Sequence, residues 1–195
     1  AQRKIEGRNF GIRKNVLQYD DVMNRQREII YTQRDQVLNG ENIHDQVMKM
    51  IEQAIENQVA QYIPKSTLKD DWNIEGLRDH YMGWMLTPQD LVYTPDELER
   101  LEPEFLVEEL TKRAKMIYEK REEAFGEPLM RELERVVLLK NVDTEWMDHI
   151  DDMEMLRQGI GLMAYGQRDP VVEYKMNAFE MFNNMITSIQ EDTVR

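Results

Sequence analysis

The side chains best suited to chemistry in this 195-residue chain are three histidines and 38 carboxylates, since cysteine is absent. Without cysteine there is no disulfide, no thiolate zinc site and no cysteine nucleophile. Glu41 and His44 have the E-x-x-H spacing of carboxylate-bridged metal sites in helical bundles, which need two such pairs. The other histidines, His80 and His149, have no glutamate three residues earlier. A metal-dependent bundle enzyme is therefore the weakest hypothesis.

Phosphate binding needs glycines that fold a loop around the anion, and the chain does not supply them in the required pattern. Lys65-Ser-Thr67 has the ending of a phosphate loop without the preceding glycines. Gly159 and Gly161 begin a G-x-G-x-x-G pattern that lacks its third glycine. Paired carboxylates occur almost everywhere among 38 acids, so they single out no catalytic residue. We expect no catalytic residue, no metal site and no cofactor in this chain.

Charge and composition exclude further classes of function. The net charge of -13 argues against nucleic acid as a partner, because such binding is built from cationic contacts to phosphate. No apolar run approaches the 18 residues of a membrane span, and no signal-peptide pattern is present. The acids are concentrated in residues 66–110, with twelve acids against three bases, whereas residues 1–14 carry five bases and one acid. We interpret both segments as solvated faces.

Helical periodicity predicts an all-α fold with an elongated first helix from about Phe10 to Leu38, ended by Asn39-Gly40. A second helix is predicted over residues 42–62, before Pro64. The stripe of the first helix is Ile12, Val16, Tyr19, Met23, Ile30 and Val37.

Residues 64–104 contain four prolines and several aromatic residues, which predicts short helices packed as a small acidic subdomain. A further helix is expected from about Glu104 to Phe125, before Gly126.

Two longer helices are predicted to form an antiparallel hairpin, the second capped by Asp169 with Pro170 at its first position. Their loop, residues 159–168, carries apolar side chains far from the core of the pair. Either this loop docks on its own chain, or it contacts another chain with Tyr165 as an anchor. The expected buried stripes are Leu129, Leu133, Val136, Leu139, Val142, Trp146, Ile150, Met153 and Leu156, then Val172, Met176, Phe179, Phe182, Ile186 and Ile189.

Two sets of motifs follow one another in the order of a known family. The first set is Glu6-Gly-Arg-Asn-Phe10, Arg13-Lys14, Tyr19-Asp-Asp-Val22, Gln26-Arg27 and Ile30-Tyr31. The second set is Trp146 with His149, Leu156-Arg-Gln-Gly-Ile160, Leu162, Ala164-Tyr165, Gln167-Arg-Asp-Pro170 and Glu173-Tyr174. Over essentially its whole length the chain resembles SecA, the ATP-driven motor of bacterial protein export.

The resemblance implies three parts: the long helix of a helical scaffold (residues 1–39), a helical wing (40–126) and a two-helix finger that completes the scaffold (127–195). The nucleotide-binding folds and the preprotein-crosslinking domain of the family would precede Ala1, and a C-terminal linker would follow Arg195. ATP and Mg²⁺ would then belong to the parent motor, and this chain alone would not hydrolyse ATP.

In this family the finger loop enters the mouth of the SecY channel and touches the moving polypeptide. Tyr165 matches the tyrosine at the tip of that loop, and the neighbouring Ile160, Leu162 and Met163 join it as predicted contacts. Met163 stands where a basic residue is common in the family, so a charge-dependent contact is not expected there. The first finger helix restrains the ATPase, and Trp146 lies in the matching segment.

The implied partners are the SecY channel complex, unfolded preproteins and the parent's own nucleotide-binding domains, without nucleic acid. The implied location is cytoplasmic, peripheral at the cytoplasmic face of the cell membrane. The alternative from another class is a free-standing helical adaptor, whose hairpin tip docks on a partner without any motor.

Overall fold

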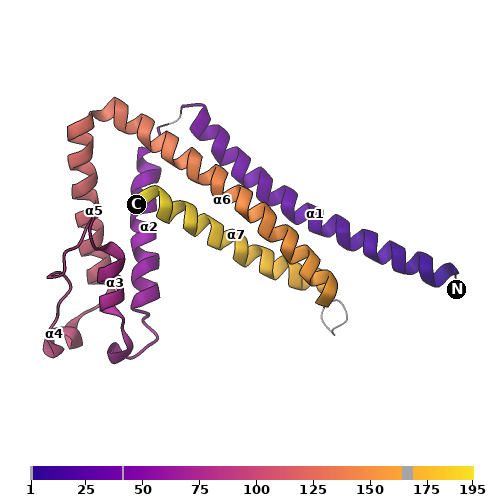
Figure 1. The fold of residues 1–195 in the computed structure, drawn as a ribbon, viewed down its shortest axis with the longest axis horizontal. Coiled ribbons are helices and arrows are strands. Elements are labelled where there is room, and N and C mark those ends of the chain that lie inside the picture. Colours follow the sequence, from indigo (N-terminus) through magenta and orange to yellow (C-terminus); the bar gives the residue numbers. More distant parts are fainter. Residues whose placement is uncertain (1, 41, 164–168) are drawn as a thin grey trace. The chain divides into compact units, whose positions relative to one another are not determined.

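The regular structure is helical, which confirms the predicted all-α class. The computed structural model describes residues 2–40, 42–163 and 169–195, and over these residues no β-strand occurs. None of the helices there is both long and apolar enough to cross a membrane. The helices are α1 (Gln2–Leu38), α2 (His44–Tyr62), the 3₁₀ helix η1 (Lys69–Asp71), α3 (Ile74–Tyr81), α4 (Pro95–Arg100), α5 (Pro103–Phe125), α6 (Glu127–Met163) and α7 (Pro170–Val194) (Figure 1).

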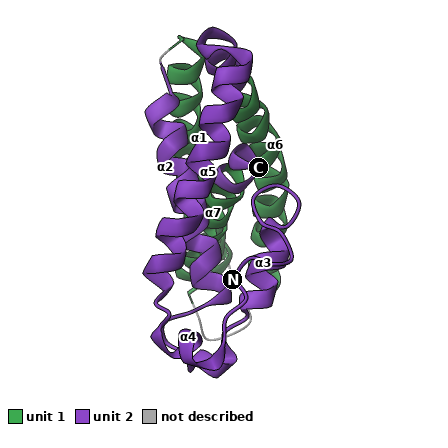
Figure 2. Ribbon diagram, turned by 90° about the vertical axis from the view of Figure 1, so that its left-hand side faces the viewer, with its two compact units in different colours: residues 1–41, 135–189 green, residues 42–134, 190–195 purple. Residues whose placement is uncertain are grey.

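The chain divides into two compact units, coloured separately in Figure 2. Unit 1 comprises residues 1–41 and 135–189, and unit 2 comprises residues 42–134 and 190–195. Helices α6 and α7 therefore each contribute to both units.

Helix α1 begins at Gln2, earlier than the Phe10 expected from periodicity. Residues 2–10 are all exposed, so this part of the helix has no buried face from which apolar periodicity could predict it. Farther along, Tyr19, Ile30 and Val37 of the predicted stripe are buried, as is Gln26 between them. Ile12 is exposed, because burial on α1 begins only at about Tyr19.

In unit 1, α6 and α7 run antiparallel, as the sequence predicted for the hairpin (Figure 1). A core cluster joins them to α1 at the end of the hairpin near its connecting segment. Its buried members are Tyr19, Met153, Ile160, Val171, Tyr174 and Ala178, and Val22, Met23, Leu156 and Met181 pack against them.

The predicted stripe of α7 was wrong over the first half of the helix. Val172, Met176 and Phe179 are exposed, Met176 and Phe179 by 66% and 70%. Of the same stripe, Ile189 is buried as expected, and Phe182 and Ile186 are half-buried. The other buried positions of α7 are Val171, Tyr174, Ala178 and Met185. Apolar residues occur on more than one face of this helix, so steps of three and four fit two phases equally well.

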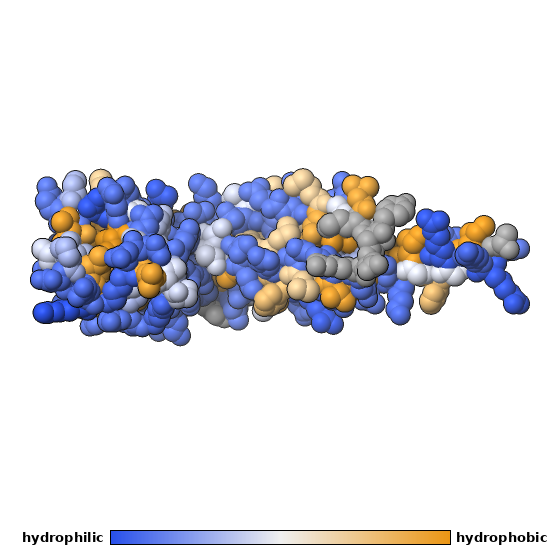
Figure 3. All heavy atoms as spheres, turned by 90° about the horizontal axis from the view of Figure 1, so that it is seen from below, coloured by the Kyte–Doolittle hydropathy of each residue, from blue (hydrophilic) through white to orange (hydrophobic). Residues whose placement is uncertain are grey.

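The predicted stripe of α6 was wrong in part for a similar reason. Leu129, Leu133, Val136 and Ile150 are exposed, while Val142, Trp146 and Met153 are buried as expected. His149 also lies on this buried face, but it is polar, so a stripe of apolar residues does not include it. Exposed apolar side chains such as these interrupt a largely hydrophilic surface, one face of which is shown in Figure 3.

In unit 2, α2 packs along α5, with α3 also against α2. Ile51, Ile55 and Val59 of α2 are buried, as are Leu106 and Leu110 of α5. Thr94 and Glu97 form a reciprocal capping box at the start of α4. Helix α5 ends at Phe125, and the next residue, Gly126, has a φ of 82°, which favours glycine.

Candidate functional site

The end of the α6–α7 hairpin is built differently from the loop expected from its glycines. Helix α6 continues through Gly159 and Gly161 to Met163, so the prediction that the loop starts at residue 159 was wrong. Ile160, between the two glycines, is buried in the core cluster and holds this last turn in place. On the other side, the side chain of Asp169 accepts a hydrogen bond from the backbone N–H of Val171 at 2.9 Å, as a helix cap does.

The four residues predicted to contact a translocating chain have different surroundings. The side chain of Leu162 is 78% exposed to solvent. Ile160 is 1% exposed and packs in the core cluster, so it supports the hairpin end and is too buried to contact another chain. The side chain of Met163 and the whole of Tyr165 lie outside the described residues.

A pair of tyrosines anchors the hairpin end to α1. The ring centroids of Tyr19 and Tyr174 are 4.4 Å apart. Burial raises the pKa of Tyr174 to about 12, so its hydroxyl stays neutral at physiological pH. The guanidinium of Arg157 lies 5.9 Å from the Tyr19 ring centroid and pairs with Asp20 at 3.2 Å. These groups fasten α6 and α7 to α1.

Farther from the hairpin end, Trp146 of α6 is buried against α1, with its ring 6.4 Å from that of Tyr31. Its indole N–H is buried and has no hydrogen-bond partner among the described residues. One helical turn away, the bidentate pair of Arg34 with Asp143, at 2.7 and 3.2 Å, also joins α1 to α6. Trp146 therefore reports directly on how α1 and α6 pack.

A buried polar link joins all three helices of unit 1. His149 donates from Nε2 to the side-chain oxygen of Gln26, 2.7 Å away. Gln26 in turn donates from its amide nitrogen to the backbone carbonyl of Ala178, 3.1 Å away. Sequence reasoning missed both residues as site members, although each continues a buried stripe at a spacing of three and four residues. The link fixes the register of α1 against α6 and α7.

Acidification from pH 7.5 to 5.5 is expected to destabilise unit 1. Burial lowers the pKa of His149, opposed in part by Asp152. In the unfolded chain His149 therefore binds a proton near pH 6.5, whereas in the folded chain it binds one only at lower pH. The free energy of unfolding consequently falls as the pH drops below 6.5. Denaturant unfolding followed by Trp146 fluorescence, with Trp72 and Trp84 replaced by phenylalanine, measures this slope. His149→Gln keeps an amide donor and should flatten it; an unchanged slope in this variant would assign the effect to other groups.

Within the described residues, no group of three or more histidine, aspartate or glutamate side chains is placed to hold a metal ion. The arrangement around the hairpin consists instead of an aromatic and apolar core, one buried polar link and an exposed leucine. Such a site can present a surface to another chain.

The family model described as the SecA Wing and Scaffold domain matches residues 1–195. The chain is 51% identical to the protein translocase subunit SecA of Carboxydothermus hydrogenoformans, 50% to that of Pelotomaculum thermopropionicum and 48% to that of Desulforamulus reducens. Each match covers 100% of this chain and 22% of the relative, so the chain spans about a fifth of the length of these proteins. With its whole length matched and half of its residues identical, the chain belongs to the SecA wing and scaffold family.

Proposed function

We propose that this chain couples the ATP-driven motion of a SecA-type motor to the movement of a preprotein through the SecY channel. In this proposal the end of the α6–α7 hairpin touches the moving polypeptide, with Tyr165, Met163 and Leu162 as the contact. The observation that carries it is Leu162, an apolar side chain 78% exposed on the last turn of α6, three residues before Tyr165.

The chemistry of this surface suits a substrate with no fixed sequence. A leucine, a methionine and a tyrosine provide flexible apolar area and one hydroxyl, without a charge that would select for opposite charges. The core cluster, which includes Ile160 and Tyr174, holds the last turn of α6, where Leu162 lies, and the start of α7. Force applied to the hairpin would thus be transmitted to α1 through packed side chains.

Trp146 has a second role in the proposal. Trp146 packs from α6 against Tyr31 of α1 and next to His149, and it thereby holds α6, the helix that we infer to restrain the ATPase of the parent. ATP and Mg²⁺ would bind the parent's nucleotide-binding domains, which are the remaining partners of this chain. The site of action would be the cytoplasmic face of the cell membrane, reached peripherally. The free-standing adaptor stays the alternative, because it needs only the same exposed hairpin end.

The proposal is tested with Tyr165→Ala and Leu162→Ala in the full-length translocase that carries this chain. ATP-driven import of a preprotein into inverted membrane vesicles should fall about tenfold for Tyr165→Ala, the effect of losing an aromatic anchor worth about 1.4 kcal/mol. Leu162→Ala should cause a smaller loss. Met155→Ala, another exposed apolar residue of α6, should leave import unchanged and serves as the matched control. Equal import by all variants at equal protein level would reject the contact.

A further inference from the structure

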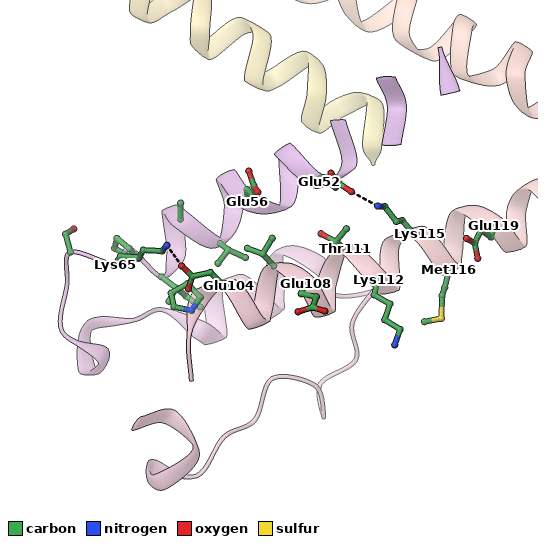
Figure 4. Close-up of a pocket in the computed structure, with 17 residues that line it drawn as sticks. Glu52, Glu56, Lys65, Glu104, Glu108, Thr111, Lys112, Lys115, Met116 and Glu119 are labelled. Atoms are coloured by element: carbon green, nitrogen blue, oxygen red, sulfur yellow. Dashed lines mark hydrogen bonds and ion pairs between the residues drawn. The ribbon is translucent and has the colours of Figure 1, made fainter. Parts of the chain in front are cut away.

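Helices α2 and α5 of unit 2 border a groove of about 1160 Å³ (Figure 4). Its floor is apolar, and three of its residues, Val59, Ile63 and Pro103, are buried. Val107 and the half-exposed Met116 extend this surface along α5. The volume exceeds the roughly 300–1,000 Å³ of ordinary small-molecule pockets. A larger apolar object would fill it better.

The rim of the groove is charged, and its charges are unequal. Two ion pairs connect the two sides, Lys65 with Glu104 and Lys115 with Glu52 (Figure 4). Four of the eight charged side chains that line the groove are therefore paired with one another.

The remaining four rim charges are three carboxylates and one ammonium. Glu56, Glu108 and Glu119 are exposed and form no ion pair among the described residues, and Lys112 is the single cation left. A partner that fills the apolar floor must therefore also satisfy an excess of negative charge at its edges. This requirement disfavours phosphate groups and nucleic acid, which would be repelled.

We propose that this groove binds an amphipathic helix of another polypeptide, with an apolar stripe on the floor and lysine or arginine on its flanks. The α2 side of the groove, from Glu52 to Ile63, is about 16 Å long, and the α5 side, from Glu104 to Glu119, about 22 Å. A helix of three to four turns has this length, and packing it beside α2 and α5 creates a three-helix arrangement.

The charges would act mainly at the edges of the bound helix. Lysine and arginine can lay their methylene stems along the apolar rim while their charged ends reach Glu56, Glu108 and Glu119. Because these carboxylates stay exposed to solvent, they contribute to choice of partner and rate of binding more than to affinity. The apolar floor would supply most of the affinity, as in other helix-in-groove complexes.

The test uses the 195-residue chain and a labelled synthetic peptide of about 15 residues, with leucine at i, i+4, i+7 and i+11 and lysine on both flanks. Fluorescence anisotropy should detect saturable binding. A peptide with glutamate in place of each lysine should bind about tenfold or more weakly, and a lysine peptide with serine in place of each leucine should also lose binding. Equal binding of either control would overturn the proposal.

Variants of the chain locate the site. Glu56→Lys with Glu108→Lys should weaken the lysine–leucine peptide about tenfold, since both side chains are exposed and their reversal leaves the fold intact. Glu123→Lys, an exposed glutamate of α5 outside the groove, is the matched control and should bind as the unmodified chain does. An unchanged affinity in the double variant would reject the groove. Light scattering tests whether the chain associates with itself. If it does, and if the double variant abolishes this self-association, the groove binds a second copy of the chain and the proposal is overturned.

Discussion

Replacing Tyr174 with alanine is expected to destabilise unit 1 by about 3–5 kcal/mol, the usual cost of removing a large aromatic side chain from a packed core. Tyr174 is 1% exposed, its ring lies 4.4 Å from that of Tyr19, and it packs with Met153, Ile160 and Ala178. The cavity would open where α1, α6 and α7 meet. A loss near 5 kcal/mol is large against the total stability of a typical domain, about 5–15 kcal/mol.

Phe179→Ala is the matched control, because it removes a similar side chain from the same helix where it is 70% exposed. This change should shift stability by no more than about 0.5 kcal/mol. Of the three tryptophans, only Trp146 belongs to unit 1, so denaturant unfolding is read from Trp146 with Trp72 and Trp84 replaced by phenylalanine. A larger loss for Phe179→Ala than for Tyr174→Ala would contradict the observed phase of α7.

The same pair of residues shows what periodicity can and cannot predict. The existence, type and antiparallel pairing of α6 and α7 followed from apolar spacing and from Asp169 and Pro170 at the start of α7. Their buried faces followed only in part, because α7 carries apolar side chains at two phases one residue apart. Only packing against α1 selects the face that contains Tyr174.

Polar residues caused the second kind of error. Gln26 and His149 are buried yet look like surface residues in the sequence, and His149 is surrounded by exposed acids. A buried amide and imidazole are tolerated because they satisfy one another and the carbonyl of Ala178. Such a link depends on three distant segments meeting, which no local pattern reveals.

The glycines at the hairpin end favour a loop that the structure does not form over residues 159–163. Gly159 and Gly161 favour a loop by composition, but Ile160 between them is buried and holds the backbone in the helix. Tertiary packing here outweighs the roughly 1 kcal/mol by which each glycine disfavours a helix. The predicted contact surface is reduced accordingly to Leu162, Met163 and Tyr165.

The largest electrostatic effect is expected in unit 2, where Arg131→Met should cost about 3–5 kcal/mol. Arg131 donates to Glu134 at 2.5 Å and to Tyr118 at 2.9 Å, and it also pairs with Glu122. The side chain of Glu134 is only 3% exposed, and burial raises the pKa of this carboxyl, opposed by His44. Without Arg131 a buried carboxylate loses its closest cation.

The double variant Arg131→Met with Glu134→Gln separates charge from packing. If the cost arises from an uncompensated carboxylate, removing that charge should recover most of the loss. Denaturant unfolding followed by Trp72 and Trp84 fluorescence, with Trp146 replaced by phenylalanine in every variant, measures it. Arg113→Met is the matched control: Arg113 is 30% exposed and pairs with Asp90, itself 22% exposed, so about 1 kcal/mol is expected. A double variant as unstable as Arg131→Met alone would instead place the loss in the packing of the Arg131 stem. Recovery in the double variant would identify the buried charge of Glu134 as the reason for an arginine at position 131.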